Sequence, residues 1–200
     1  MSEPVPMPGR RERNKQDKLD RITAAARELF IERGVDDVTT QQIADRADIG
    51  AGTLFLYART KSELLLLVQN SSYADALERG TAAAADEPDV LTAVMAIVRP
   101  VVECNRSQID NGRYYLREIV FGDPEETHHR DALALTVRTE QAIGVALARH
   151  PRIDVAAAAT SAHVISAVMF LAMAATPYVG RTVDEVVDDI RQQVRVLLPR

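Results

Sequence analysis

The chain of 200 residues contains one cysteine and few aromatic residues. With Cys104 alone, no intramolecular disulfide can form, which favours a reducing compartment and predicts a cytoplasmic protein. Residues 1–14 hold prolines and arginines but no apolar segment of the kind that a signal peptide has. The longest apolar run, residues 164–175, is shorter than the ~20 residues of a membrane-spanning helix, so no membrane segment is expected.

Motifs that are typical of enzymes are missing as well. The sequence has no Gly-rich phosphate loop, no G-x-S-x-G elbow, no H-E-x-x-H motif and no cysteine pair, and Cys104 has no identifiable base. Two overlapping Glu-x-x-His pairs lie within residues 125–129, but metal sites of this type in helix bundles need a second segment of ligands. We therefore expect no enzymatic activity, no cofactor and no metal site.

The net charge of −5 is distributed unevenly. Residues 1–62 carry a net charge of +1 and residues 63–200 carry −6, and positive charge is concentrated at Arg10, Arg11, Arg13, Lys15 and Lys18. A flexible basic arm over residues 1–14 would lie along DNA phosphates, although a solvated tail would have the same composition. The acidic total argues against an architectural protein that binds DNA without sequence preference.

Helical periodicity and the placement of proline and glycine predict an all-α protein. The first helix, residues 15–33, has one apolar face and ends before Gly34. Thr39 and Gln42 form a capping box for a short helix over residues 40–47. Later helices are expected over residues 51–57, 61–84, 89–98, 112–121, 124–148 with Asp123 as its N-cap, 155–175, and from Thr182 onward with a capping box to Glu185.

Two short helices joined by a three-residue turn, after a supporting helix, are typical of a helix-turn-helix. An ordinary helical hairpin has the same spacing. Asp48 suits the left-handed conformation in the turn, Gly50 can serve as the next N-cap, and Phe55 is expected to pack between the short helices. The residues expected to face outward are Thr40, Gln41, Gly52, Thr53 and Tyr57.

A specific combination of residues occupies this region. Between Arg21 and Leu65 it comprises Ile22, Ala25-Ala26, Leu29-Phe30, Gly34, Thr39-Thr40, Ile43-Ala44, Ala47, Ile49, Gly52-Thr53-Leu54-Phe55, Tyr57 and Lys61-Ser62-Glu63-Leu64-Leu65. This stretch, roughly a quarter of the chain, resembles the DNA-binding domain of the TetR family of transcriptional regulators. It departs from the family pattern at three positions, with Asp48 in place of a turn glycine, Gly50 in place of serine and Ala58 in place of phenylalanine.

The resemblance implies specific DNA contacts. Gln41 would read a base edge, because its amide can pair with adenine through two hydrogen bonds. Ala51 and Gly52 would allow close approach to thymine methyl groups. The phosphate contacts would come from Thr40, Thr53, Tyr57 and Lys61.

The family resemblance also implies a domain organisation and partners. A DNA-binding domain over residues 15–62 would be linked by a long helix to a larger ligand-binding and dimerisation domain over residues 63–200. The partners would be an operator in double-stranded DNA, a small-molecule effector and a second copy of the chain. The expected function is a repressor that leaves a palindromic operator when the effector binds. The alternative is a helical ligand-binding or enzymatic protein that retains the helix-turn-helix shape without binding DNA.

The last two predicted helices offer a seam for a homodimer. In the final helix, apolar residues recur in alternating steps of three and four, at Val183, Val186 or Val187, Ile190, Val194 and Leu197. The preceding helix offers small residues at Ala156 to Ala159, Ala162, Ser166 and Ala167. We expect these helices to form the dimer interface, although both stripes can also be buried within one chain.

The sequence gives weaker indications of which residues bind the effector. Aromatic, methionine and cysteine side chains of the larger domain are the candidates for an adaptable apolar lining. Few charged groups are among them, which predicts a mostly apolar effector. The helix that begins at Lys61 would transmit the effect of ligand binding to the DNA-binding domain. The candidate lining residues are Tyr73, Met95, Cys104, Tyr115, Phe121, His163 and Phe170.

Overall fold

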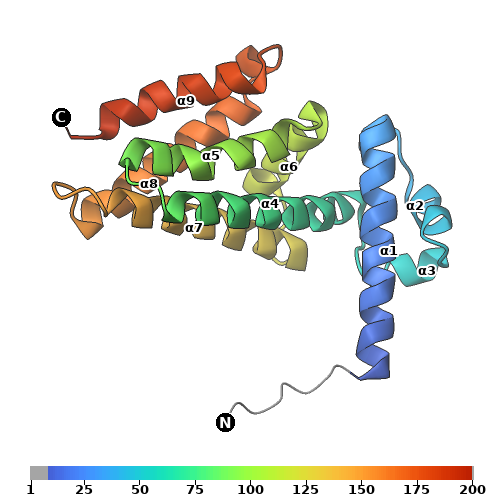
Figure 1. Ribbon diagram of the computed structural model, residues 1–200. Helices are drawn as coiled ribbons and strands as arrows, with labels where there is room; N and C mark the ends of the chain where they lie inside the picture. The colour runs from blue at the N-terminus through green and yellow to red at the C-terminus, as the bar shows by residue number, and fades with distance from the viewer. Residues whose placement is uncertain (1–8, 200) are drawn as a thin grey trace, which may run out of the picture. The chain divides into compact units, whose positions relative to one another are not determined.

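The computed structural model describes residues 9–199, and every regular element within this range is a helix (Figure 1). The all-α prediction is confirmed. The chain divides into two compact units, Met1–Val68 and Gln69–Arg200, and α4 contributes residues to both. The elements are α1 Arg10–Arg33, α2 Thr40–Arg46, α3 Ala51–Leu54, α4 Lys61–Ala85, α5 Val90–Arg106, α6 Ile109–Phe121, α7 Thr127–Leu147, α8 Val155–Ala174, the short 3-10 helix Thr176–Tyr178 and α9 Val183–Leu197.

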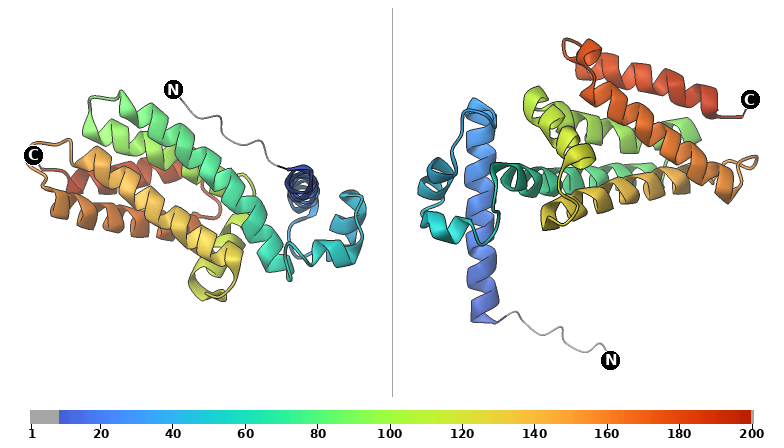
Figure 2. Two further views of the ribbon diagram at one scale, coloured as in Figure 1. Left: turned by 90° about the horizontal axis from the view of Figure 1, so that it is seen from below. Right: turned by 180° about the vertical axis from the view of Figure 1, so that it is seen from behind.

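In the N-terminal unit, α2 and α3 lie on one side of α1 (Figures 1 and 2). Their shared core contains Ile22 and Phe30 of α1, Ile43 of α2 and Leu54 of α3, all of which are at most 1% exposed. Ala44 and Ala47 of the helix-turn-helix are buried beside them, and Ile49 in the turn is half-buried. The three helices therefore hold one another through a single small core.

Helix α1 begins earlier than predicted. The flexible arm was expected over residues 1–14, but residues 10–14 are helical, Gly9 is the N-cap, and residues 1–8 lie outside the described part of the chain. Arginine and glutamate are good helix formers, and the backbone N–H of Arg13 already donates to the Gly9 carbonyl (3.0 Å). The basic residues from Arg10 onward therefore have fixed positions on a helix.

Helix α5 continues through Pro100, where the sequence predicted that it would end at Val98. The apolar stripe of α5 extends past the proline to the buried Val101 and Val102, so packing outweighs the lost hydrogen bond. Proline at position 100 cannot donate to the Ala96 carbonyl. Gly80 of α4 packs against that carbonyl so closely that an added Cβ would lie 2.8 Å from it.

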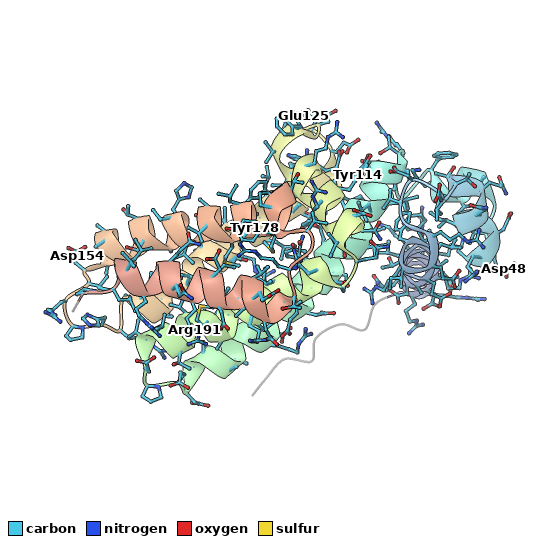
Figure 3. The ribbon with its side chains drawn as sticks, turned by 90° about the horizontal axis from the view of Figure 1, so that it is seen from above. Asp48, Tyr114, Glu125, Asp154, Tyr178 and Arg191 are labelled. Carbon is cyan, nitrogen blue, oxygen red and sulfur yellow. The ribbon has the colours of Figure 1, made fainter. Side chains whose placement is uncertain are left out.

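The start of α7 was predicted wrongly. Asp123 was expected to be the N-cap with Pro124 in the first turn, whereas the N-cap is Glu126 and the helix begins at Thr127. The Asp123 carboxylate accepts a hydrogen bond from the Glu125 N–H (2.9 Å), which closes a turn before the helix can start. Glu125 lies in the resulting loop after α6 (Figure 3). The capping boxes at Thr39 and at Thr182, by contrast, are confirmed.

The apolar stripe of α9 is buried inside its own chain. Val186, Val187, Ile190 and Val194 are at most 1% exposed, because α9 packs on α5 and α8. The seam that the heptad spacing suggested for a dimer is therefore occupied by intramolecular contacts. Arg106 fixes the start of this arrangement, since its buried guanidinium donates to the carbonyls of Tyr178, Val179 and Arg181 just before α9.

Helix α8 is apolar on its buried face and on much of its exposed face. Ala162, Ile165 and Met169 are buried, whereas Val164 is 40% and Leu171 61% exposed. Among the described residues, α8 is one helix that is long and apolar enough to cross a membrane, whereas the length of the apolar run predicted no such segment. A core helix of a soluble protein has the same length and composition. A helix with apolar residues on all sides is typically buried on all sides, so the exposed apolar face of α8 is expected to contact another surface.

Candidate nucleic-acid interface and ligand cavity

The turn between α2 and α3 sets the shape of the helix-turn-helix. Asp48 has a φ of 53°, so it adopts the left-handed conformation that the sequence predicted for it. The N–H of Ile49 donates to the Ala44 carbonyl (3.0 Å) and that of Asp48 to the Asp45 carbonyl (3.2 Å), which together form a Schellman motif. Gly50 then serves as the N-cap of α3, also as predicted.

Replacement of Asp48 with glycine is expected to stabilise the protein. Glycine adopts a positive φ without steric cost, so Asp48→Gly should raise the free energy of unfolding by about 0.5–1 kcal/mol. The ion pair that would be lost, to Arg21 at 3.6 Å, involves an Asp48 side chain that is 98% exposed and contributes little. Urea unfolding measures the effect. Asp45→Gly, inside α2, is the matched control and should destabilise; a loss of stability in Asp48→Gly would contradict this account of the turn.

All seven predicted DNA-contact residues lie at or near the helix-turn-helix surface. They occupy α2, α3, the turn after α3 and the first position of α4. Gln41 and Gly52 are exposed, and Thr40, Ala51, Thr53, Tyr57 and Lys61 are half-buried. The Gln41 amide is held by Asp45 (2.7 Å), so its side chain has a defined direction before any ligand arrives.

The start of α4 positions Lys61. The Thr60 hydroxyl accepts from the Glu63 N–H (3.0 Å), and the Glu63 carboxylate accepts from the Arg59 N–H, so the first turn is capped from both directions. The Lys61 ammonium donates to the Asp36 carbonyl (3.0 Å). This half-buried cation therefore lies at a helix N-terminus, where an anion is favoured by the helix dipole as well.

A basic cleft runs between the beginning of α1 and the residues at and after α3. Of the described residues that line it, four are cationic and none is acidic: Arg10, Arg11, Asn14, Lys15, Lys18, Thr53, Leu56 and Tyr57. The Tyr57 hydroxyl donates to the Lys15 carbonyl (3.3 Å), which ties the two sides together. Two of the residues predicted to contact phosphate, Thr53 and Tyr57, thus share one cleft with the basic turns of α1.

The aromatic residue that follows α3 differs from expectation. Phe55 was expected to pack between the short helices, but it is 46% exposed, and the next residue, Leu56, is 83% exposed. Helix α3 ends at Leu54 instead of near Tyr57, so the following residues form a turn that points Phe55 out of the core. Both apolar side chains belong to the outer surface of the helix-turn-helix.

The C-terminal unit contains a cavity of about 70 Å³. The rings of Tyr73 and Tyr115 stack on one side, with centroids 4.8 Å apart. Burial raises the pKa of both phenols, so both are neutral at physiological pH. The Tyr115 hydroxyl donates to Asn70 Oδ1 (2.8 Å), and Asn70 Nδ2 donates to the His128 carbonyl (2.8 Å), which links the cavity wall to α4 and α7.

The predicted effector-binding residues separate into two groups. Tyr73, Tyr115 and Phe170 line the cavity. Met95 is buried elsewhere in the core, and Cys104, which is half-buried, is not part of the cavity lining. Phe121 is 79% exposed at the end of α6. His163 lies on the exposed side of α8, where it contacts Glu140 (3.0 Å). Phe121 and His163 do not line the cavity, because each points away from the helix face that closes it.

Comparison with known protein families decides the identity of the N-terminal unit. Residues 22–68 match the family described as bacterial regulatory proteins, tetR family. The N-terminal unit matches the TetR family. The matched segment contains the whole helix-turn-helix and the beginning of α4, so the unit with the basic cleft is similar to the DNA-binding domain of TetR-family regulators. A comparison with curated proteins gives no match.

Solved structures extend the similarity from the N-terminal unit to the fold of the chain. A TetR regulator from Rhodococcus sp. RHA1 is 18% identical, with a TM-score of 0.66 over 92% of this chain and 97% of the other. Thermus thermophilus FadR, a transcriptional repressor in complex with lauroyl-CoA, is 22% identical, with a TM-score of 0.66 over 91% and 96%. A regulator from Streptomyces coelicolor is 20% identical, again with a TM-score of 0.66, over 91% and 94%. The fold is that of TetR-family regulators over nearly the whole chain.

Sequence reasoning missed several residues of both sites. For the N-terminal unit, it treated Arg10 and Arg11 as part of a mobile arm and did not consider Leu56. The clustering of positive charge was the available signal, but the helical start that fixes it was not recognised. For the cavity it missed Thr136, Thr139 and Ser166, whose small polar side chains have no distinctive pattern in a helix.

Proposed function

We propose that this chain is a cytoplasmic, non-catalytic repressor of the TetR family that binds a palindromic operator as a homodimer and leaves it when a small molecule occupies the cavity. The observation that carries the proposal is the basic cleft beside α3. Four cationic side chains line it together with Thr53 and Tyr57, whereas the chain as a whole has a net charge of −5. A cleft lined by charge of one sign attracts phosphate strongly, so the acidic total does not oppose DNA binding here.

The exposed apolar face of α8 supports the homodimer. Val164, Ala167 and Leu171 follow steps of three and four on the accessible side of the helix. Small residues such as Ala156 and Thr160 continue this face toward the start of α8, which allows a second helix to approach closely. A second copy of the chain covers such a face by symmetry, and two reading units then match two half-sites.

The cavity and its hydrogen bonds support a response to an effector. The solved structure of FadR, which has the same fold, is a complex of a repressor with lauroyl-CoA. In this chain, Asn70 of α4 accepts the hydrogen bond of Tyr115 at the cavity wall. Because α4 also contributes its first residues to the DNA-binding unit, we propose that it carries the effect of ligand binding.

The decisive experiment is selection of bound fragments from a random or genomic DNA pool. A palindromic consensus, with half-sites about one helical turn apart, is the expected result. Retention of DNA without any shared sequence, or no retention at low salt, would contradict sequence-specific regulation. Transcription from the selected site, measured with and without the protein, then distinguishes repression from activation.

Substitutions within the interface should distinguish residues that contact the phosphate backbone from residues that recognise a base. Lys61→Ala and Tyr57→Phe are each expected to weaken binding to all operator variants alike, because phosphate contacts carry no sequence information. Lys61→Ala, which removes a charge, should also lower the salt dependence, the slope of log K against log salt, by about 1, whereas Tyr57→Phe should leave this slope unchanged. Gln41→Ala should instead change the preference at one symmetric pair of positions by about 1–3 kcal/mol.

Fluorescence anisotropy on the selected operator and its single-base variants measures these effects. Arg117→Ala, an exposed cation on α6 in the C-terminal unit, is the control and should leave both affinity and salt slope unchanged. A uniform loss across all bases in Gln41→Ala would restrict this residue to backbone contact. Wild-type affinity in both Lys61→Ala and Tyr57→Phe would overturn the proposed docking surface.

A further inference from the structure

The cavity in the C-terminal unit has an uncharged lining. None of the described residues that line it is acidic, basic or histidine. Its polar side chains are two tyrosines, two threonines and Ser166, and the burial that raises the pKa of both phenols keeps them protonated. A carboxylate or ammonium group placed there would lose its hydration without gaining an opposite charge. The lining therefore selects uncharged molecules.

Three of the five hydroxyl groups in the lining already donate their protons in hydrogen bonds within the chain. Thr136 donates to the Ala132 carbonyl (3.2 Å) and Thr139 to the Leu135 carbonyl (2.9 Å), and Tyr115 donates to Asn70. A hydroxyl has one proton and two lone pairs, so these groups retain acceptor capacity only. The Tyr73 hydroxyl, which also lines the cavity, is buried without a hydrogen-bond partner among the described residues and can still donate. A ligand hydroxyl, which both donates and accepts, therefore complements such a wall.

The dimensions limit the body of the ligand. An engineered protein cavity of about 150 Å³ holds benzene, and this cavity measures about 70 Å³. Met169 and Met173 are part of the lining, and unbranched methionine side chains repack readily to admit a single ring. A twelve-carbon acyl chain exceeds what such repacking provides.

We propose that this cavity binds a small uncharged alcohol or phenol, whose apolar body lies against Tyr73, Tyr115 and the methionines and whose hydroxyl donates to Thr136 or Thr139. The proposal rests on the proposed function, in which this unit receives the effector. It differs from the lauroyl-CoA of the FadR complex in both size and charge. Selectivity comes from two threonines that lie three residues apart on one face of α7, each of which donates to the backbone carbonyl four residues earlier.

The first test compares four single-ring probes with the full-length wild-type protein by isothermal titration calorimetry. Phenol and benzyl alcohol should bind about 5-fold more tightly than toluene, which lacks the hydroxyl, because a net hydrogen bond is worth this factor. Benzoate, which is charged, should not bind. Toluene binding as tightly as phenol, benzoate binding, or lauroyl-CoA binding in preference to phenol would each overturn the proposal.

The second test removes the acceptors. Thr136→Val with Thr139→Val keeps the shape of both side chains, so it should reduce the affinity for phenol to that for toluene while toluene still binds. Retained toluene binding demonstrates an intact cavity. Thr23→Val is the matched control, since Thr23 of α1 also donates to a carbonyl one turn earlier (2.9 Å) but lies outside this unit. Undiminished preference for phenol in the double variant would overturn the role of the threonines.

The outcome is separable from that of the proposed function. Operator binding is measured independently on the DNA selected above. If the protein binds its operator but binds all the probes equally, the proposed ligand class is refuted while the proposed regulatory function stands. A protein that binds phenol with the expected preference but selects no DNA sequence refutes the proposed function and leaves the ligand class intact.

Discussion

Val164→Asp combined with Leu171→Asp is expected to convert the proposed homodimer into a folded monomer whose operator affinity is about 10²–10⁴-fold lower. The two side chains are 40% and 61% exposed on α8, so aspartate is hydrated in the separate chain. In the dimer, four carboxylates would be buried against apolar surface without partners, which costs several kcal/mol each. The loss of affinity follows because one reading unit alone forfeits the effective concentration of the second.

Sedimentation at micromolar concentration and anisotropy on the selected operator measure this result. Val137→Asp combined with Val145→Asp on α7 is the matched control, since these valines are 52% and 71% exposed. It should remain dimeric and bind the operator normally. A dimeric α8 variant would show that another surface joins the two chains, and dissociation of the α7 variant would place the interface there.

Aspartate substitutions in the apolar stripe of α9, by contrast, are expected to unfold the protein. Ile190→Asp with Val194→Asp places two carboxylates at positions that are at most 1% exposed within one chain, between α5 and α8. Each buried charge without a partner costs several kcal/mol, and a domain of this kind is stable by only about 5–15 kcal/mol in total. We expect loss of the cooperative thermal transition, with operator binding lost as a consequence.

Circular dichroism at increasing temperature measures the outcome. Gln192→Asp with Gln193→Asp adds the same charge to the exposed side of α9 and should leave the transition in place. A folded monomer carrying Ile190→Asp and Val194→Asp would mean that the α9 stripe is free in the separate chain and belongs to a dimer seam after all. The α8 and α9 variants together thus distinguish an intermolecular face from an intramolecular one.

The contrast between these two helices explains where sequence reasoning failed. Steps of three and four on α9 indicate one apolar face, but the period is identical whether that face meets its own chain or a partner. Helix α8, which is apolar on most of its circumference, gave no such pattern. Its exposed half becomes visible only when the packing of α5, α7 and α9 has accounted for the other half.

Local features were predictable because they depend on neighbours in the chain. The capping boxes at Thr39 and Thr182, the left-handed Asp48 and the N-cap Gly50 were all correct. Helix ends that depend on competing contacts were not, as the start of α7 at Thr127 and the passage of α5 through Pro100 demonstrate. In the first a local turn outweighed a good capping sequence, and in the second buried packing outweighed a helix breaker.

The sequence by itself determined the all-α class, the helix-turn-helix and the resemblance of the N-terminal unit to the TetR family, because each is encoded by side chains a few residues apart. Only the tertiary structure decided which residues enclose the cavity and which apolar faces remain uncovered. Tyr73, Tyr115, Thr139 and Phe170 come from four different helices, and no sequence period relates their positions. Phe121 and His163 have equally suitable chemistry yet lie outside the cavity, because the direction of a side chain is set by how its helix is rotated against the others.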